Sequence, residues 1–251
     1  MRLTFLGTGT STGVPVIGCK CKVCQSSDIR DKRMRASVFL EVDDKNILID
    51  CGPDFRAQML FHDIDQIDAI LLTHKHIDHI GGIDDLRPLG NKKIYLDKQT
   101  EDAVRQMYGY CFAENPYPGV PSLSLEKISY EPFKICDGTI EVIPIRVMHG
   151  KMEIMGYRIG NFAYITDVSS LADDAEYEKL KGLEVVVLGC LRMTEHHSHQ
   201  KFQEAMEMAK RINAKQTFFT HMCHHIGLHS EIEDLVPENI MFAYDGLSIA
   251  F

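Results

Sequence analysis

Long hydrophobic runs are missing from this sequence. No stretch among its 251 residues approaches the roughly 20 consecutive apolar residues that a membrane-spanning helix needs. The apolar start that follows Arg2, LTFLG, is far too short for a secretory signal. We therefore expect a protein of the cytoplasm that has no membrane partner.

Positive charge is also scarce. The chain has 27 Lys and Arg residues against 36 Asp and Glu residues, a net charge of −9. This balance argues against a broad electrostatic surface for nucleic acid, so we expect no nucleic-acid partner. Residues 20–35 depart from it, with six basic residues against two acidic ones, so an anionic group could approach there.

The sequence lacks a phosphate-loop signature as well. The glycine-rich GTGTSTG at 7–13 has neither the Gly-Lys-Ser/Thr ending nor the G-x-G-x-x-G spacing, and we interpret it as a tight turn. Internal repeats and linkers are absent too. Strand and helix patterns mix along the whole chain, which favours a single α/β domain over residues 1–251.

Runs rich in β-branched and apolar residues predict the strands, and amphipathic runs predict the helices. The predicted strands lie at 2–7, in a hairpin within 36–52, and at 67–73, 139–150, 154–160, 161–169, 183–190 and 214–222. The predicted helices cover 53–63, with Pro53 in the first turn, 97–110, 172–182 and 199–213. We expect a loop at 111–124 that serves as a lid or as the contact of a homodimer.

The segment LLTHKHIDHIGG at 71–82 is rich in potential metal ligands. In a single helix His74 and His76 would lie about 200° apart, and in a single strand His79 would point away from the others. We therefore expect a strand end that turns into a loop. His74 and His76 would hold one ion, and Asp78 and His79 beyond the bend would hold a second one, because imidazole and carboxylate suit divalent transition metals.

Further ligands stand at the ends of other predicted strands. His149, Asp167 and His221 each close an apolar β-run, as His74 does, so all of them could meet at one edge of a sheet. Asp167 has two oxygens and is the natural bridge between two ions.

The cysteines indicate a second metal site. Cys19, Cys21 and Cys24 form a C-x-C-x2-C motif in a loop at 18–25, and thiolates this close suit a structural zinc with a fourth ligand. Candidates for that ligand are Cys223, His224, His225 and His229.

The THKHIDH motif, followed by His149, Asp167 and His221 in that order, resembles the metallo-β-lactamase-fold hydrolases. The resemblance covers essentially the whole chain and implies a four-layer αββα sandwich. It also implies one metal on His74, His76 and His149. The second metal would lie on Asp78, His79 and His221, and Asp167 would bridge the two.

The early C-x-C-x2-C motif together with the late TH-x-x-H motif is similar to one branch of that family, the phosphoribosyl 1,2-cyclic phosphate phosphodiesterases. This resemblance implies that His224 completes the zinc site and that His199 is the general acid. It leaves His197 as a residue that could position substrate. Asp50, at the end of NILID, is a candidate partner for a metal-bound histidine.

Two divalent ions, Zn, Mn or Fe, can hold a bridging hydroxide that attacks a phosphodiester in line while an acid protonates the leaving group. We therefore expect a binuclear phosphodiesterase that acts on a small or cyclic anionic substrate, with Asp78 and His199 in the catalytic site. Three alternatives remain open: an RNase Z-type nuclease, a glyoxalase II-type thioester hydrolase and a non-catalytic metal-binding protein. The protein of quinone-cofactor biosynthesis has an altered metal motif, whereas all seven positions are intact here.

Overall fold

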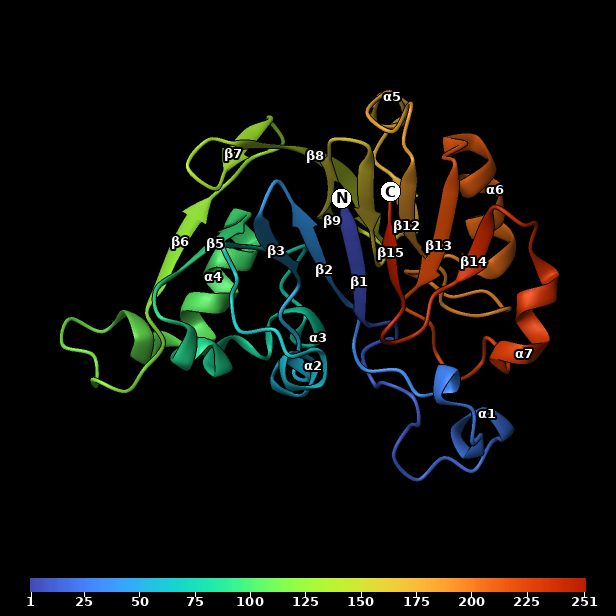
Figure 1. Ribbon diagram of the computed structural model, residues 1–251, viewed down its shortest axis with the longest axis horizontal. Helices are drawn as coiled ribbons and strands as arrows, with labels where there is room; N and C mark the ends of the chain where they lie inside the picture. Colours follow the sequence, from blue (N-terminus) through green and yellow to red (C-terminus); the bar gives the residue numbers. More distant parts are fainter.

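The computed structural model describes residues 1–251 and shows two β-sheets packed face to face, with helices on both outer faces (Figure 1). This is the predicted four-layer α/β sandwich. The first sheet has the strand order β15-β1-β2-β3-β4-β5-β6. Its strands are β1 Arg2–Gly7, β2 Ser37–Val42, β3 Lys45–Ile49, β4 Ala69–Leu71, β5 Lys92–Leu96, β6 Leu123–Lys127 and β15 Ser248–Ala250.

The second sheet has the order β11-β8-β9-β10-β12-β13-β14, with β7 paired to β8 outside this path. Its strands are β7 Phe133–Ile135, β8 Ile140–His149, β9 Met152–Ile159, β10 Phe162–Ile165, β11 Ser170–Leu171, β12 Val185–Gly189, β13 Gln216–Thr220 and β14 Ile240–Phe242. In both sheets the central βα units run parallel, so their carboxyl ends meet at one edge of the sandwich.

The helices are short, and none is long and apolar enough to span a bilayer. They are α1 Lys22–Gln25, α2 Phe55–His62, α3 Ile77–Ile80, α4 Lys98–Met107, α5 Ala175–Glu178, α6 Phe202–Ile212 and α7 His229–Ile232. Four 3-10 segments cover Ile29–Asp31, Ile83–Leu89, Gly109–Phe112 and Glu233–Leu235.

Three apolar clusters fill the spaces between these layers. The middle cluster lies between the sheets, where the rings of Phe5 and Phe218 are 5.5 Å apart. One outer cluster joins α2 and α4 to the first sheet, and the other joins α6 to the second sheet through residues such as Met208 and Ile212. The sheets therefore form a rigid support, and the loops at their shared edge carry the polar residues.

All of the predicted strands are present, and the differences concern helices, a loop and strands that were not predicted, such as β5, β6 and β14. The hairpin within 36–52 turns at Asp43 and Asp44, whose positive φ values of 49° and 58° give the backbone twist that a tight hairpin needs. Pro53 lies before α2 rather than in its first turn. The helix predicted at 172–182 is reduced to the single turn of α5, and the loop predicted at 111–124 is shortened to 113–122.

Candidate metal centre

The histidine-rich segment leaves the first sheet directly after β4. Two hydrogen bonds from β9 fix this segment just before His74. The Tyr157 hydroxyl donates to the Leu72 carbonyl (2.5 Å), and the Met155 amide donates to the Thr73 carbonyl (3.0 Å). His76 keeps an extended conformation (φ −65°, ψ 148°) and precedes α3. The predicted loop beyond the bend is thus wrong, because Asp78 and His79 lie in this one helical turn.

The second sheet supplies the other three side chains. His149 is the last residue of β8, whereas Asp167 and His221 directly follow β10 and β13. Asp167 (φ 51°) and His221 (φ 59°) adopt the left-handed backbone conformation, which is uncommon for residues other than glycine. Strain of this kind often accompanies functional sites, and here it turns both side chains towards α3.

The structure brings together all seven predicted ligands in two groups. His74, His76 and His149 form the first group; Asp78, His79, Asp167 and His221 form the second; within each group the ligand atoms lie within 4.8 Å of one another. Asp167 faces both groups, because its Oδ1 lies 3.2 Å from His221 Nε2 and 3.9 Å from His74 Nε2, while its Oδ2 lies 3.2 Å from His79 Nε2.

The protonation pattern around His79 shows that this cluster fits a cation. Its Nδ1 donates to the Asp50 carboxylate (2.7 Å), which leaves Nε2 buried without a hydrogen-bond partner and 3.2 Å from both Asp78 and Asp167. A lone pair facing two carboxylates is repulsive unless positive charge lies between them. Although burial lowers it, the carboxylates of Asp167, Asp78 and Asp50 raise the pKa of His79 well above its ordinary value. The site therefore demands either a proton or a metal ion.

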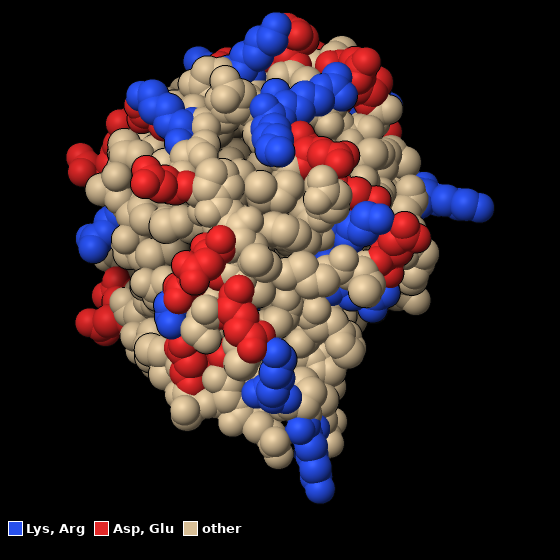
Figure 2. Space-filling model, turned by 90° about the vertical axis from the view of Figure 1, so that its right-hand side faces the viewer, with Lys and Arg blue, Asp and Glu red and all other residues tan.

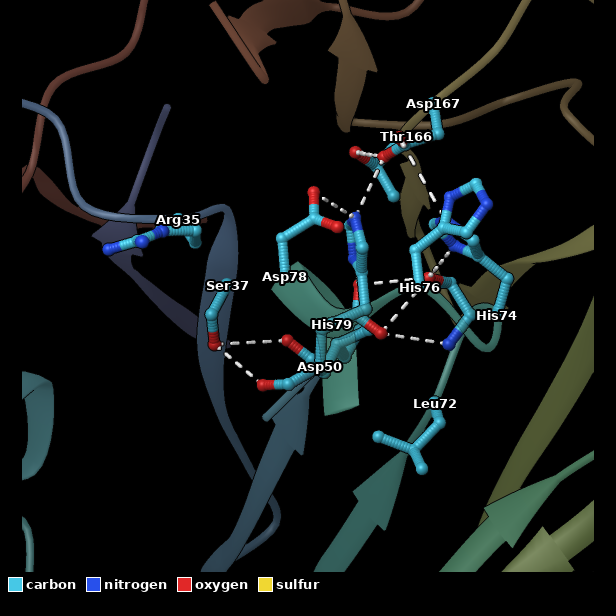
Figure 3. A network of polar contacts seen from close by, with 12 residues as sticks. Arg35, Ser37, Asp50, Leu72, His74, His76, Asp78, His79, Thr166 and Asp167 are labelled. Atoms are coloured by element: carbon cyan, nitrogen blue, oxygen red, sulfur yellow. Dashed lines mark hydrogen bonds and ion pairs between the residues drawn. The ribbon is translucent and has the colours of Figure 1, made fainter. Parts of the chain in front are cut away.

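A buried network orients these side chains (Figure 3). The Asp50 carboxylate accepts hydrogen bonds from the Thr73 amide (2.8 Å) and hydroxyl (2.9 Å) and from His79, as expected for a partner of a metal-bound histidine. In the same way His149 Nδ1 donates to the Ser198 carbonyl (2.9 Å), which leaves Nε2 free for a metal.

Threonines beside the ligands are the residues that sequence reasoning missed. Besides Thr73, the Thr166 hydroxyl donates to Asp167 Oδ2 (2.7 Å). A signal was available, because Thr73, Thr166 and Thr220 each precede a ligand at the end of a strand. This repeated Thr–ligand pair could have predicted the hydrogen bonds of Thr73 and Thr166, whereas the Thr220 hydroxyl is buried without a hydrogen-bond partner.

The histidines of the loop before α6 lie at different depths. His199 packs against His149 and His221, with ring centres 4.5 and 5.0 Å apart, and its Nδ1 lies 3.9 Å from Asp167 Oδ1. Burial, with a contribution from His221, lowers the pKa of His199 to about 3. His197 is exposed, and His196 is the nearer neighbour, 5.1 Å from the His199 ring. Because His199 also lies within ligand distance of His149 and Asp167, it could serve as an acid or as a ligand.

The cysteine motif meets one of the four predicted partners. His224 Nδ1 lies 3.3 Å from Cys19 Sγ, 3.4 Å from Cys21 Sγ and 3.5 Å from Cys24 Sγ. Cys223, His225 and His229 are not part of this cluster; the Cys223 thiol instead accepts a hydrogen bond from the His225 amide, and the His229 amide donates to Asp31. Three thiols and one imidazole match the donor set of a structural zinc.

The basic stretch at 20–35 carries less free charge than its composition indicates. Four of its six cations form ion pairs: Lys22 with Glu231, Arg30 with Asp28 and Glu233, Arg33 with Asp31, and Arg35 with Asp54. Lys20 and Lys32 form no such pair, so the approach of an anionic group there stays a prediction that depends on these two residues. Acidic and basic side chains are also interspersed over the face shown in Figure 2.

Comparisons with known proteins agree with this geometry. A family profile described as "Beta-lactamase superfamily domain" matches residues 45–222. The crystal structure of a new diphosphatase from the PhnP family superimposes with a TM-score of 0.92 at 40% identity, covering 100% of this chain and 97% of that one. Zinc-bound PqqB from Methylobacterium extorquens superimposes with a TM-score of 0.82 at 19% identity over the full length of both chains, which shows the shared fold.

Among curated proteins, an octanoyltransferase of Porphyromonas gingivalis is 44% identical over 253 residues, which cover 98% of this chain but 51% of that protein. The chain thus spans about half the length of this relative, and less of the next ones. The family profile and the diphosphatase match together cover the ligand-bearing strands and the cysteine motif. The chain belongs to the β-lactamase superfamily, as a hydrolase of the metallo-β-lactamase fold.

Proposed function

We propose that this chain is a binuclear metal-dependent phosphodiesterase that acts on small or cyclic substrates, with His199 as the general acid. One observation carries the proposal: Asp167 of the second ligand group also faces His74 of the first group, and His199 lies against members of both groups. Paired metal sites of this kind are typical of enzymes that displace a group at phosphorus.

His74, His76 and His149 would hold the first ion, and Asp78, His79 and His221 the second, with Asp167 between them. Two Zn, Mn or Fe ions would lower the pKa of a bound water and offset negative charge on the phosphoryl oxygens. Asp50, which accepts a hydrogen bond from the Thr73 hydroxyl, fixes the ring of His79 through its Nδ1. Asp78 contacts His79 and His221 through Oδ2, which leaves its Oδ1 to accept a proton from the attacking water.

His199 would donate a proton to the leaving oxygen. Its low pKa means that the ring is neutral in the protein alone, and an arriving phosphodiester anion would favour the protonated form. The loop that carries His199 is tied to the first ligand group, because His149 donates to the Ser198 carbonyl. This hydrogen bond therefore fixes the position of His199 relative to the metal ligands.

Phosphoryl chemistry is supported by the similarity to a PhnP-family protein described as a diphosphatase. A nuclease of the RNase Z type is a weaker fit. The loop at 113–122 projects from the molecule beyond β6 (Figure 1), but it contains no Lys or Arg that could bind RNA.

A thioester hydrolase is the second candidate. The observation that favours it is the 44% identity to a protein named octanoyltransferase, an acyl-transfer enzyme by its name. Because this chain matches only 51% of that protein, the transferase activity could reside in its other half. The cysteine cluster and His199 have no evident role in thioester hydrolysis.

The test compares bis(p-nitrophenyl) phosphate, p-nitrophenyl phosphate and an octanoyl thioester, each with Mn²⁺ or Zn²⁺ added. His76→Ala is the blank, because His76 is an exposed member of the first ligand group. Hydrolysis of the diester that disappears in the variant supports the proposal. Turnover of the thioester alone by fully metal-loaded protein would favour the second candidate, and no turnover of any substrate would favour a non-catalytic protein.

A further inference from the structure

Arg192 is a cation without a carboxylate partner at the base of the loop that carries His199. The carboxylate of Glu195, in the same loop, pairs with Lys201 instead (2.9 Å). Two guanidinium nitrogens of Arg192 donate to backbone carbonyls, Nε to Thr194 (3.3 Å) and Nη2 to Glu195 (2.5 Å). Nη1 donates to no protein acceptor and retains its hydrogen-bonding capacity.

The backbone places Arg192 beside both metal-binding regions. The Phe202 amide donates to the Arg192 carbonyl (2.9 Å), and the Leu191 amide donates to the Gln200 carbonyl (3.1 Å). These two bonds join the beginning and the end of the loop that carries His199. On the other side the Cys223 amide donates to the Leu191 carbonyl (2.9 Å). Arg192 therefore lies between the His199 loop and the turn that follows His221.

Two further histidines surround this cation. His196 lies 5.1 Å from His199, ring centre to ring centre, and His225 is exposed on the turn after His221. The Arg192 guanidinium donates to the carbonyl of Glu195, the residue before His196. The Cys223 amide, two residues before His225, donates to the carbonyl of Leu191, the residue before Arg192, so both histidines belong to segments that adjoin Arg192. One fixed positive charge and two imidazoles thus border the site, in a chain whose net charge is −9.

A guanidinium with a free edge suits an oxygen anion, because its N–H groups match the geometry of a phosphate or carboxylate. We propose that Arg192, flanked by His196 and His225, determines specificity by binding a second anionic group of the substrate beside the phosphoryl group that is cleaved. This inference rests on the proposed function, since it assumes that the reacting phosphoryl lies at the metal pair. The preferred substrate is then a phosphodiester that carries an additional phosphate or carboxylate.

The test uses two ligands that differ only in the second anion, thymidine 5′-monophosphate and thymidine 3′,5′-bisphosphate. Their affinities are measured by calorimetry on the metal-loaded protein and as inhibition constants against bis(p-nitrophenyl) phosphate. We expect the bisphosphate to bind about tenfold more tightly, since a charged hydrogen bond is added. In Arg192→Gln this advantage falls to about twofold or less.

Arg192→Lys and Arg211→Gln are the companion variants. Lysine keeps the positive charge, so Arg192→Lys should recover part of the tighter binding of the bisphosphate. If a variant only disordered the loop, both ligands would bind more weakly by the same factor, and the ratio of their affinities would stay unchanged. Arg211 pairs with Asp174 on the outside of α6, and its replacement should change nothing. Equal affinities in the wild type, or an advantage that persists in Arg192→Gln, would overturn the inference. Because calorimetry needs no turnover, failure of the phosphodiesterase proposal would be seen separately.

Discussion

At the scale of the residue, Asp50 shows how one buried carboxylate organises the centre. Its side chain is fully buried, and its carboxylate accepts charged hydrogen bonds from His79 and Thr73. Asp50→Asn keeps the shape but replaces an acceptor with a donor opposite His79 Nδ1. We expect metal affinity to fall about 10–100-fold, measured as metal retained after dialysis against graded chelator.

Asp63→Asn is the matched control for this change. Asp63 is exposed and ends α2 in the left-handed conformation, which asparagine also tolerates. This variant should retain its metal like the wild type. Equal retention by Asp50→Asn would show that the carboxylate does not support the metal ligands.

His199 is the other residue with a separable role. If it is an acid rather than a ligand, His199→Ala should keep both catalytic ions while turnover falls about 10²–10⁴-fold. The loss should be larger for diphenyl phosphate than for bis(p-nitrophenyl) phosphate, because p-nitrophenolate leaves readily without a proton. Elemental analysis beside rates on the two esters checks this; loss of an ion from the variant would instead make His199 a ligand.

At the scale of the element, the contact between α3 and the segment before α2 depends on glycine. A Cβ at Gly82 would lie 2.2 Å from the Gly52 carbonyl oxygen and 2.6 Å from Phe55 Cβ. Gly82→Ala should therefore displace α3 and cost about 1–3 kcal/mol in the free energy of unfolding. Urea denaturation measures the cost, and Gly109→Ala, whose Cβ would meet no atom within 4 Å, should stay near the wild type.

The cysteine loop is an element that lacks a sizeable core of its own. Its apolar cluster contains only Val14, Val23 and Cys24 as fully buried residues, so metal binding would supply much of its stability. Cys21→Ser should remove one equivalent of zinc and expose 18–25 to proteolysis. Cys111→Ser, which changes a thiol outside the cluster, should do neither; a zinc content that is the same in both variants would contradict a structural zinc here.

The elements also show where sequence reasoning succeeds and fails. Strand ends were predictable because runs such as FAYITD and QTFFTH stop at a polar residue, and this placed Asp167 and His221 at one edge. The turn of α3 was not predictable, since four residues are too few to show helical periodicity. For the same reason nothing local indicated that α5 would be one turn. The choice of His224 over His225 came only from the family resemblance, because both histidines are equally near the motif in the sequence.

At the scale of the whole molecule, the two ends of the chain close the sandwich together. The Met1 amine donates to the Phe251 carbonyl (2.8 Å), and β15 pairs with β1. Just before β15, Asp245 joins distant segments, because it accepts hydrogen bonds from the Thr8 hydroxyl (2.7 Å) and the Met34 amide (2.6 Å). Such pairings between residues more than 200 positions apart cannot be predicted from one sequence, since no local pattern encodes them.

Asp245 also makes the stability of the molecule depend on pH. Burial raises its pKa to about 7, despite opposing hydrogen bonds from Met34 and Thr8 and the positive charge of Arg33. The folded protein therefore holds a proton that the unfolded chain releases near pH 4. Its contribution to stability is complete below that pH and is lost as the pH rises through about 7.

Asp245→Asn should remove this dependence, because an amide stays neutral and the Thr8 hydroxyl can accept a hydrogen bond from it. The variant should gain stability relative to the wild type between pH 6 and pH 8 as measured by urea denaturation at each pH, and the difference should shrink towards pH 5. Asp65→Asn, at an exposed position, should follow the wild-type curve. If Asp245→Asn instead loses stability most strongly at pH 8, the carboxylate is charged in the folded protein, and its electrostatic attraction to the buried Arg33 outweighs the cost of burial.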